Sequence, residues 1–276
     1  MTKIQLVADT HCHLTLDQFD VDRDEVMARA EEAGVSPILI PGTDLPSSRR
    51  AVELAQASRV LFAAVGVHPH EAKTWTESTP KDLAELASNP VVVAIGEIGL
   101  DFYREYSPRS VQEHVFESQL ELAAELGLPV IVHQRDAEDE VLSRLVAWHE
   151  NLPDGLLRER PGVLHGFSSS LAMAERAVQA GFYLGLGGPV TFKNAKSLRQ
   201  IVPSLPLDRL LTETDAPFLA PHPHRGKRNE PAMTRLVAQE LSTLMESPLD
   251  VVAQVTSNNA ASLFGWDHGT ANRHLL

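Results

Sequence analysis

Residues 129–165, PVIVHQRDAEDEVLSRLVAWHENLPDGLLRERPGVLH, show the pattern from which the fold class follows. A short apolar run, Pro129–Val132, is followed by a segment with helical periodicity, Ala137–His149, and then by a second apolar run, Gly162–Leu164. Short apolar runs that alternate with helices are typical of parallel strands in a sheet covered on both faces. Each of the two runs also stops at a histidine.

The same alternation extends over the whole chain. Six more runs of this kind are Ile4–Ala8, Pro37–Ile40, Val60–Gly66, Val91–Ile95, Phe182–Leu186 and Arg209–Thr212. The other helix candidates are Asp22–Ala33, Ser47–Ala57, Lys81–Ala87, Pro108–Leu126, Leu171–Ala180, Ala195–Val202, Pro231–Glu246 and Leu249–Phe264. Eight strand–helix units predict a (β/α)8 barrel. An open doubly wound sheet is the alternative, but the first strand–helix turn lacks a GxGxxG or Walker A sequence.

We therefore expect one α/β domain of the TIM-barrel type with an extra C-terminal helix, over residues 1–266, and a loose tail over residues 267–276. Of the 276 residues, 43% are hydrophobic and 22% are charged, which argues against a disordered, collagen-like or coiled-coil chain. The formal net charge is −13, which disfavours unspecific binding to nucleic acid or to anionic membranes. An anionic substrate therefore requires a local positive centre.

Cysteine usage and hydropathy indicate the cellular environment. Cys12 is the only cysteine, which excludes an internal disulfide bond and a metal site made of cysteines alone. The longest apolar stretch, about Val60 to Val67, is far shorter than the roughly 18 residues of a membrane span, and no basic segment followed by an apolar one opens the chain. We expect a soluble cytoplasmic protein without a membrane partner, and no obligate protein partner is inferred.

Residue types that bind metals stand at the ends of the predicted strands. In chain order they are His11 and His13 after the first strand, His68 after the third, Glu97 after the fourth, His133 after the fifth, His165 after the sixth and Asp215 after the eighth. Active sites of such barrels lie at the carboxyl ends of the strands, where residues distant in sequence meet. The sequence therefore predicts one metal centre at the mouth of the barrel.

His11 and His13 are separated by one residue at a strand end. Alternation along a strand places both imidazoles on the same side, where together they suit a divalent ion, and it turns Cys12 the other way. Two histidines that merely cap the barrel would give the same pattern, so the pair alone leaves both interpretations open. Cys12 is expected to be a small buried hydrophobic residue.

The acidic residues require partners. Glu97 follows Val91–Ile95 directly, and a buried carboxylate must meet a cation or become protonated. That cation is either a metal ion, two of which one carboxylate can bridge, or an arginine such as Arg135. Asp101 either orients a ligand or occupies a turn. At the last strand we assign Asp215 as a ligand and Glu213 as the acid that holds a ligating imidazole in its tautomer.

The motifs occur in a fixed order along the chain. They are DTHCH (Asp9–His13), GVHP (Gly66–Pro69), GEIGLD (Gly96–Asp101), HQR (His133–Arg135), HGFS (His165–Ser168) and ETDAP (Glu213–Pro217), followed by RNEP (Arg228–Pro231). Together they resemble the TatD family of metal-dependent deoxyribonucleases, a branch of the amidohydrolase-like barrels, from Asp9 to Phe264. One departure is Gly166 with Ser169, where the family usually reads His-Cys-Phe-Ser-Gly. This departure affects the expected shape of the loop after His165, and His165 itself is still expected to be a ligand.

The resemblance implies a set of site residues and an activity. One divalent ion would be held by His11, His13, Glu97 and Asp215, a second by Glu97, His133 and His165, and the residue near the scissile phosphate would be His68. The implied activity is that of a nuclease supported by magnesium or manganese, often a 3′ to 5′ exonuclease on single-stranded DNA. Barrels of the wider superfamily that use a bridging carbamylated lysine place it after the fourth strand, and here that position is Glu97.

Such a centre would hydrolyse phosphodiester bonds. Two divalent ions with Glu97 and Asp215 leave about +2 in the cavity, which overrides the negative net charge at short range. Ions about 3.5–4 Å apart generate hydroxide near neutral pH and stabilise both oxygens of a displacement at phosphorus. We expect two ions of Mg, Mn or Zn, DNA strand ends as substrate, and Asp215, Glu97 and His68 as catalytic residues, with Asp215 as the base.

Further residues are candidates for substrate binding. Backbone phosphates are assigned to Arg225, Lys227 and Arg228 of the basic loop Pro221–Arg228 and to Arg135, Lys193 and Asn194. A short basic run is also typical of an ordinary solvated loop. Stacking of a terminal base is assigned to Phe102, Tyr103 and Phe192.

The metal ligands alone do not select the substrate. The same centre would hydrolyse amides, lactones or esters, including the aminoacyl linkage on tRNA. A metal-free glycosidase that uses Glu97 and Asp215 as acid and nucleophile is another alternative, and a binding scaffold with a structural metal is a third. Chelation and variants of the phosphate-binding residues discriminate between these functions.

Overall fold

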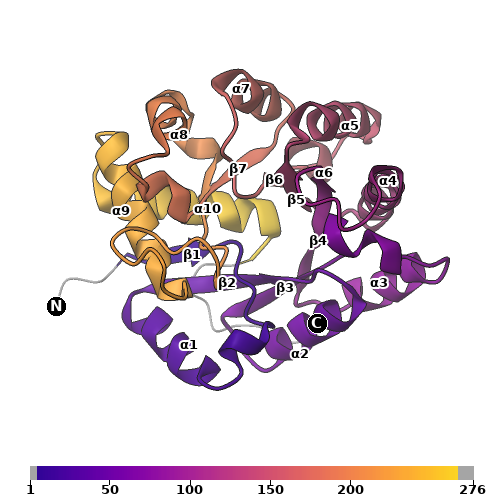
Figure 1. The fold of residues 1–276 in the computed structure, drawn as a ribbon, viewed down its shortest axis with the longest axis horizontal. Helices are drawn as coiled ribbons and strands as arrows, with labels where there is room; N and C mark the ends of the chain where they lie inside the picture. Colours follow the sequence, from indigo (N-terminus) through magenta and orange to yellow (C-terminus); the bar gives the residue numbers. More distant parts are fainter. Residues whose placement is uncertain (1–4, 267–276) are drawn as a thin grey trace.

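The computed structural model describes residues 5–266 as a barrel of eight parallel strands surrounded by helices (Figure 1). The strands pair in chain order and are β1 (Val7–Asp9), β2 (Val35–Pro41), β3 (Leu61–Val65), β4 (Val92–Asp101), β5 (Val130–Arg135), β6 (Gly162–Leu164), β7 (Tyr183–Leu186) and β8 (Leu210–Thr212). The predicted (β/α)8 architecture is confirmed.

The barrel closes between the first and the last strand. The backbone N–H of Thr10 donates to the carbonyl oxygen of Thr212 at 3.1 Å. Beyond the strands, the N–H of Asp215 donates to the carbonyl of His11 at 2.8 Å, and the N–H of His13 donates to that of Ala216 at 2.8 Å. Backbone hydrogen bonds therefore hold the two segments that carry three of the predicted ligands.

The helices form the outer layer. They are α1 (Arg23–Glu32), α2 (Leu45–Gln56), α3 (Thr79–Ala87), α4 (Arg109–Leu126), α5 (Glu138–Asn151), α6 (Leu156–Glu159), α7 (Leu171–Gln179), α8 (Lys196–Ile201), α9 (Thr234–Leu244) and α10 (Leu249–Phe264). Short 3₁₀ turns are η1 (Asp17–Phe19), η2 (Pro69–Thr74), η3 (Gly188–Thr191), η4 (Val202–Ser204), η5 (Leu207–Arg209) and η6 (Pro231–Met233). Local sequence sets some ends: Asp44 and Ser47 form a capping box at α2, and Gly127 ends α4 in the left-handed conformation.

The interior of the barrel is an apolar cluster to which every strand contributes. Its strand members include Ala8, Leu39, Ala64, Ala94, Ile131, Val163, Tyr183 and Leu211. Leu263, Phe264 and Trp266, at the end of α10 and just beyond it, complete the same cluster. Figure 1 shows α10, in yellow, passing behind the strands. The extra C-terminal helix therefore packs on the barrel, and the polar residues are left to the opposite, carboxyl end of the strands.

Strands β4 and β5 run further than the apolar runs predict. The expected ends at Ile95 and Val132 are wrong, because β4 continues to Asp101 and β5 to Arg135. The two strands pair through this extension, with a register shift between Ile95 and Ile98. A side chain added to Gly99 (φ +138°) would lie 2.0 Å from the carbonyl oxygen of His133, so glycine permits this close approach. Glu97 thus lies at an irregular point of a buried strand, where such shifts redirect side chains.

The expected tail, residues 267–276, lies outside the described residues, as does the start of the first predicted strand at Ile4. Within residues 5–266, no helix has the length and apolar character needed to cross a membrane.

Candidate metal centre

Glu97 lies at the centre of the polar site. Its side chain is buried, and its atom Oε2 lies 3.3 Å from Nε2 of His11 and 3.6 Å from Nε2 of His13. Its other oxygen, Oε1, faces three ring nitrogens: His165 Nε2 at 2.9 Å, His133 Nδ1 at 3.0 Å and His68 Nε2 at 3.4 Å. One carboxylate therefore faces two separate sets of imidazoles, one with each oxygen.

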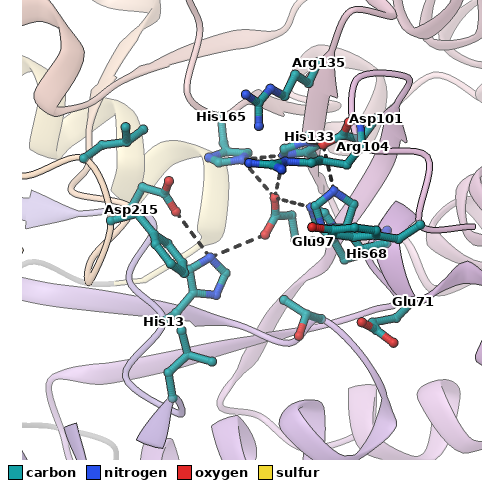
Figure 2. A pocket seen from close by; sticks show the side chains of 16 residues that line it. His13, His68, Glu71, Glu97, Asp101, Arg104, His133, Arg135, His165 and Asp215 are labelled. Atoms are coloured by element: carbon teal, nitrogen blue, oxygen red, sulfur yellow. Dashed lines mark hydrogen bonds and ion pairs between the residues drawn. The ribbon is translucent and has the colours of Figure 1, made fainter. Parts of the chain in front are cut away.

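Asp215 completes the set on the His13 side. Its Oδ1 lies 3.3 Å from Nε2 of His13 and 3.9 Å from Nε2 of His11, and these two nitrogens are 3.2 Å apart. Asp215 has a φ of +56°, in the left-handed region. Figure 2 shows Asp215 and His13 on one side of Glu97, with Asp101 and His68 on the other.

Two buried acids outside this set lie beside the rings of His133 and His165. Oδ2 of Asp101 lies 3.4 Å from Nε2 of His133, and Oε1 of Glu213 lies 3.4 Å from Nδ1 of His165. An N–H directed at each acid leaves Nδ1 of His133 and Nε2 of His165 as lone-pair atoms. These two atoms lie 3.3 Å apart, and both face Oε1 of Glu97.

Such an arrangement requires positive charge between the rings and the carboxylate. Burial by itself raises the pKa of Glu97, but the neighbouring imidazoles of His165, His68 and His11 bring that pKa well below its usual range. Conversely, burial lowers the pKa of His165, but Glu97 and Glu213 raise it well above its ordinary value. Bound protons or a bound cation would supply the charge that this geometry demands.

The donor set fits divalent metal ions. Groups of three ligand atoms lie within 4.8 Å of one another in the sets His11–Glu97–His165, His11–His13–Asp215 and His68–Glu97–His133. Imidazole and carboxylate ligands without a thiolate suit zinc, manganese, iron or magnesium. Cys12 is buried in the hydrophobic core and belongs to none of these sets, as the alternation of the strand predicts.

His68 differs from the other imidazoles. Its Nδ1 accepts a hydrogen bond from the backbone N–H of His70 at 3.1 Å, so the proton of the neutral ring is on Nε2, next to Glu97. Burial lowers the pKa of His68 to about 4, which keeps the ring neutral at pH 7. His68 is therefore arranged as a hydrogen-bond donor rather than as a lone-pair ligand.

The loop that departs from the family pattern is anchored by Glu213. The backbone N–H of Gly166 donates to Oε1 of Glu213 at 2.6 Å, beside the contact of that acid with His165. Gly166 has a φ of +58°, a conformation that glycine adopts without strain. The loop keeps His165 next to Glu97, with Nε2 of the ring 2.9 Å from Oε1 of the acid.

A cavity of about 640 Å³ opens above these residues. Arg135 lines it, and its guanidinium lies 3.9 Å from the ring centroid of Tyr103. The alternative ion pair between Arg135 and Glu97 is not formed, because imidazoles surround this acid.

Arg228 is not brought to the cavity. Its guanidinium donates to both carboxylate oxygens of Asp22 at 2.8 and 2.6 Å, to Glu230 at 2.9 Å and to the carbonyl of Gln18 at 2.6 Å. It also lies 5.0 Å from the ring centroid of Phe19. These contacts join the loop after β8 to the start of α1, so Arg228 packs here, away from the residues that line the cavity.

Two of the predicted stacking residues are also engaged elsewhere. Phe192 is buried and has the guanidinium of Arg225 at 4.0 Å from its ring centroid. Phe102 packs against the core, with Arg109 at 4.3 Å from its centroid. Tyr103, the third of them, is exposed.

Several cavity-lining residues stand in loops after strands and were not predicted from the sequence. They are Thr43, Arg104, Tyr106, Phe218 and Leu219. His70 and Glu71 of η2 also line the cavity. Nε2 of His70 lies 2.8 Å from Oδ2 of Asp101. Their position shortly after strand ends was the available signal, but loop residues have no periodicity that would separate lining from solvated positions.

Comparisons with known proteins agree with this geometry. The model of a family described as TatD related DNase matches residues 8–265. The chain is 41% identical to the uncharacterized metal-dependent hydrolase YabD of Bacillus subtilis, over 94% of this chain and 99% of that protein. It is 40% identical to the 3′-5′ ssDNA/RNA exonuclease TatD of Erwinia amylovora, over 93% and 99%. The solved structure of YJJV, a TatD homologue from Escherichia coli, superimposes with a TM-score of 0.88 at 36% identity, over 95% and 98%.

Proposed function

Since the chain belongs to the TatD related DNase family of metal-dependent hydrolases, we propose that it removes nucleotides from the 3′ ends of single-stranded DNA. The observation that carries the proposal is Glu97, whose two carboxylate oxygens face His11 and His13 on one side and His133 and His165 on the other. This arrangement suits two divalent ions that share one bridging carboxylate.

We assign the ions to the chain's own residues. One would be held by His11, His13, Glu97 and Asp215, and the other by Glu97, His133 and His165. Bound divalent ions would neutralise phosphate charge and activate water near neutral pH. Asp101 and Glu213 keep the lone pairs of His133 and His165 directed at the centre, and magnesium or manganese is the proposed metal.

The remaining steps belong to side chains. Oδ1 of Asp215 faces His13, which leaves Oδ2 to accept a proton from the water that attacks phosphorus. The bond from phosphorus to the 3′ oxygen of the remaining strand breaks, and that oxygen takes up a proton and leaves as a hydroxyl group. The neutral ring of His68 donates from Nε2 to a nonbridging oxygen of the scissile phosphate. The guanidinium of Arg135, held over Tyr103, binds a neighbouring phosphate.

A chelation and rescue assay tests the proposal. The metal content of the protein is analysed first. Oligonucleotides labelled at the 5′ or the 3′ end are then incubated with the untreated protein, with the protein in chelator, and with the chelated protein after addition of Mg²⁺ or Mn²⁺. We expect chelator to stop the reaction and either ion to restore it. A 3′ label should be released at once and a 5′-labelled strand should shorten stepwise.

Two results would contradict the proposal. Shortening of the oligonucleotide that persists in chelator would contradict a metal-dependent reaction, and chelator-resistant cleavage of a glycoside would favour the metal-free glycosidase chemistry on Glu97 and Asp215. Retained metal without turnover of any oligonucleotide, together with turnover of an amide or ester, would favour an amidohydrolase or an aminoacyl-tRNA deacylase.

A further inference from the structure

We propose that Tyr106 and Phe218 are stacking platforms for the bases of a single-stranded end, and that Arg104 and Arg135 bind the adjoining phosphates. The inference rests on the proposed function, because it assigns the part of the substrate that the metal centre does not contact. It concerns the rim of the cavity rather than its floor.

Exposed aromatic side chains gather at the opening of the cavity. Among the large hydrophobic residues of the described chain, three aromatic ones are exposed: Tyr103 at 56%, Tyr106 at 57% and Phe218 at 48%. Tyr106 and Phe218 line the cavity, and Tyr103 carries the guanidinium of Arg135, which also lines it. Exposed aromatic groups that cluster at one opening indicate a binding site.

The two platforms lie on opposite sides of the metal centre. The ring of Phe218 lies 6.0 Å from that of His13, which faces Oε2 of Glu97. The ring of Tyr106 lies 4.8 Å from that of His70, and Asp101 connects His70 to His133 on the Oε1 side. A DNA strand that crosses the metal centre would therefore contact one of these two aromatic rings before the scissile bond and the other after it.

Two guanidinium groups supply positive charge at the same rim. Apart from the histidines, the cationic residues that line the cavity are Arg104 and Arg135. Both guanidinium groups lie over the ring of Tyr103, at 5.3 and 3.9 Å from its centroid. Within residues 5–266 neither has a carboxylate within salt-bridge distance, whereas Arg228 is occupied by Asp22 and Glu230. In a chain of net charge −13, two such guanidinium groups at one rim provide phosphate contacts.

These features together select an unstacked base. A base inside a duplex already stacks on its neighbours, but a base at a single-stranded end has free faces that an aromatic ring can cover. Each base–aromatic stack corresponds to roughly 5- to 100-fold in affinity. The phosphate contacts add a dependence on salt and not on base identity.

The test uses the full-length protein with Mg²⁺ and single-stranded oligonucleotides that carry 2-aminopurine at the last or the penultimate position. Phosphorothioate linkages at the 3′ end keep the charge and slow cleavage. Stacking on a ring quenches 2-aminopurine fluorescence. We expect the wild type to quench both positions, and Phe218→Ala and Tyr106→Ala each to lose quenching at one position and to weaken binding roughly 5- to 100-fold.

Controls separate stacking from other effects. Leu156→Ala removes a side chain that is 68% exposed on α6, away from the cavity, and should change neither quenching nor affinity. Arg135→Ala should keep the quenching but lower the slope of log affinity against log salt by about 0.7 for each phosphate that it no longer binds. An oligonucleotide with an abasic end should bind the wild type as weakly as the normal strand binds Phe218→Ala or Tyr106→Ala.

Unchanged quenching and affinity in the double variant Tyr106→Ala/Phe218→Ala would overturn the inference, even if the protein still cleaves 3′ ends. Lost quenching in that variant would support the stacking site, even if the wild type proved to cleave a different bond. The two proposals can therefore fail separately.

Discussion

Replacing Arg228 by alanine should lower stability and leave the binding of oligonucleotides unchanged. The guanidinium holds Asp22, at the start of α1, and Glu230, beyond β8, and a second arginine, Arg29, contacts both acids at 3.4 and 2.7 Å. The pair Arg228–Asp22 is bidentate, which gives it more order than an ordinary surface ion pair. Arg228 thus fastens a helix to the loop that follows Asp215.

The magnitude follows from the exposure of these groups. The side chains of Arg228 and Asp22 are 28% and 29% exposed, so solvent screens much of their attraction. Charge-assisted hydrogen bonds and the contact of the guanidinium with Phe19 together give about 1–2 kcal/mol of stability. For a chain of this size we expect the melting temperature to fall by roughly 3–6 °C.

The difference in stability between the wild type and Arg228→Ala should also depend on pH. The hydrogen bond from Arg228 lowers the pKa of Asp22, and although burial raises the pKa of Glu230, Arg29 and Arg228 bring it below its usual value. Groups whose pKa is lower in the folded state stabilise the fold above their unfolded pKa, about 4, and lose that contribution as the pH falls through the folded value. The gap between wild type and Arg228→Ala should therefore be constant near neutrality and shrink below about pH 4.

Thermal unfolding between pH 3 and 8 measures the stability of each variant. The affinity for a 3′-phosphorothioate oligonucleotide measures whether binding is unchanged. Arg135→Ala is the matched control, because its guanidinium lies at the cavity and makes no ion pair with the described residues. It should lower the affinity, and it should lower the melting temperature less than Arg228→Ala, since only the contact with Tyr103 is lost. An Arg228→Ala protein that melts like the wild type but binds the oligonucleotide as weakly as Arg135→Ala would contradict the packing role of Arg228 and favour a direct phosphate contact.

Three further outcomes are expected. Asp215→Asn should abolish hydrolysis and weaken metal binding while the protein stays folded, because it removes one charge and no core volume. Calorimetric titration with Mn²⁺ measures metal binding and circular dichroism measures folding. Loss of the fold would mean that Asp215 has a structural role. Asp9→Ala should lower the free energy of unfolding by about 3–5 kcal/mol, because buried Asp9 accepts hydrogen bonds from the N–H and the hydroxyl of Thr214 at 2.9 and 2.6 Å and from the N–H of His11 at 3.3 Å, and both N–H groups would lose this acceptor. Urea unfolding measures this, and a loss below about 1 kcal/mol would contradict the prediction. Glu213→Gln should weaken metal binding roughly 10- to 100-fold through the orientation of His165, and an unchanged titration would show that Glu213 does not set that ring.

The alternation of apolar runs and helices was enough to predict the barrel. Leu249–Phe264 was predicted with the bounds that α10 has, because its periodic apolar face and the terminal Gly265 are local signals. The ends of β4 and β5 were placed too early, because the Gly96–Asp101 and His133–Arg135 segments have no continuous apolar run. Their pairing depends on the neighbouring strand, which no local pattern contains.

For the candidate metal centre, the order of strands along the chain was sufficient to predict which residues meet. His11, His165 and Asp215 follow strands, and Glu97 and His133 lie in the second halves of β4 and β5. Parallel strands bring their carboxyl ends to one mouth whatever their separation in the chain.

The contacts of those residues and of the loops between them became visible in the folded chain alone. The fold gave each oxygen of Glu97 its own set of imidazoles, turned Arg228 toward Asp22 and placed Tyr106 and Phe218 at the cavity. The physical reason is that a strand end has a position fixed by the hydrogen bonds of the sheet. A long side chain in a loop, in contrast, is positioned by whichever partner it finds in space, and sequence spacing does not contain that partner.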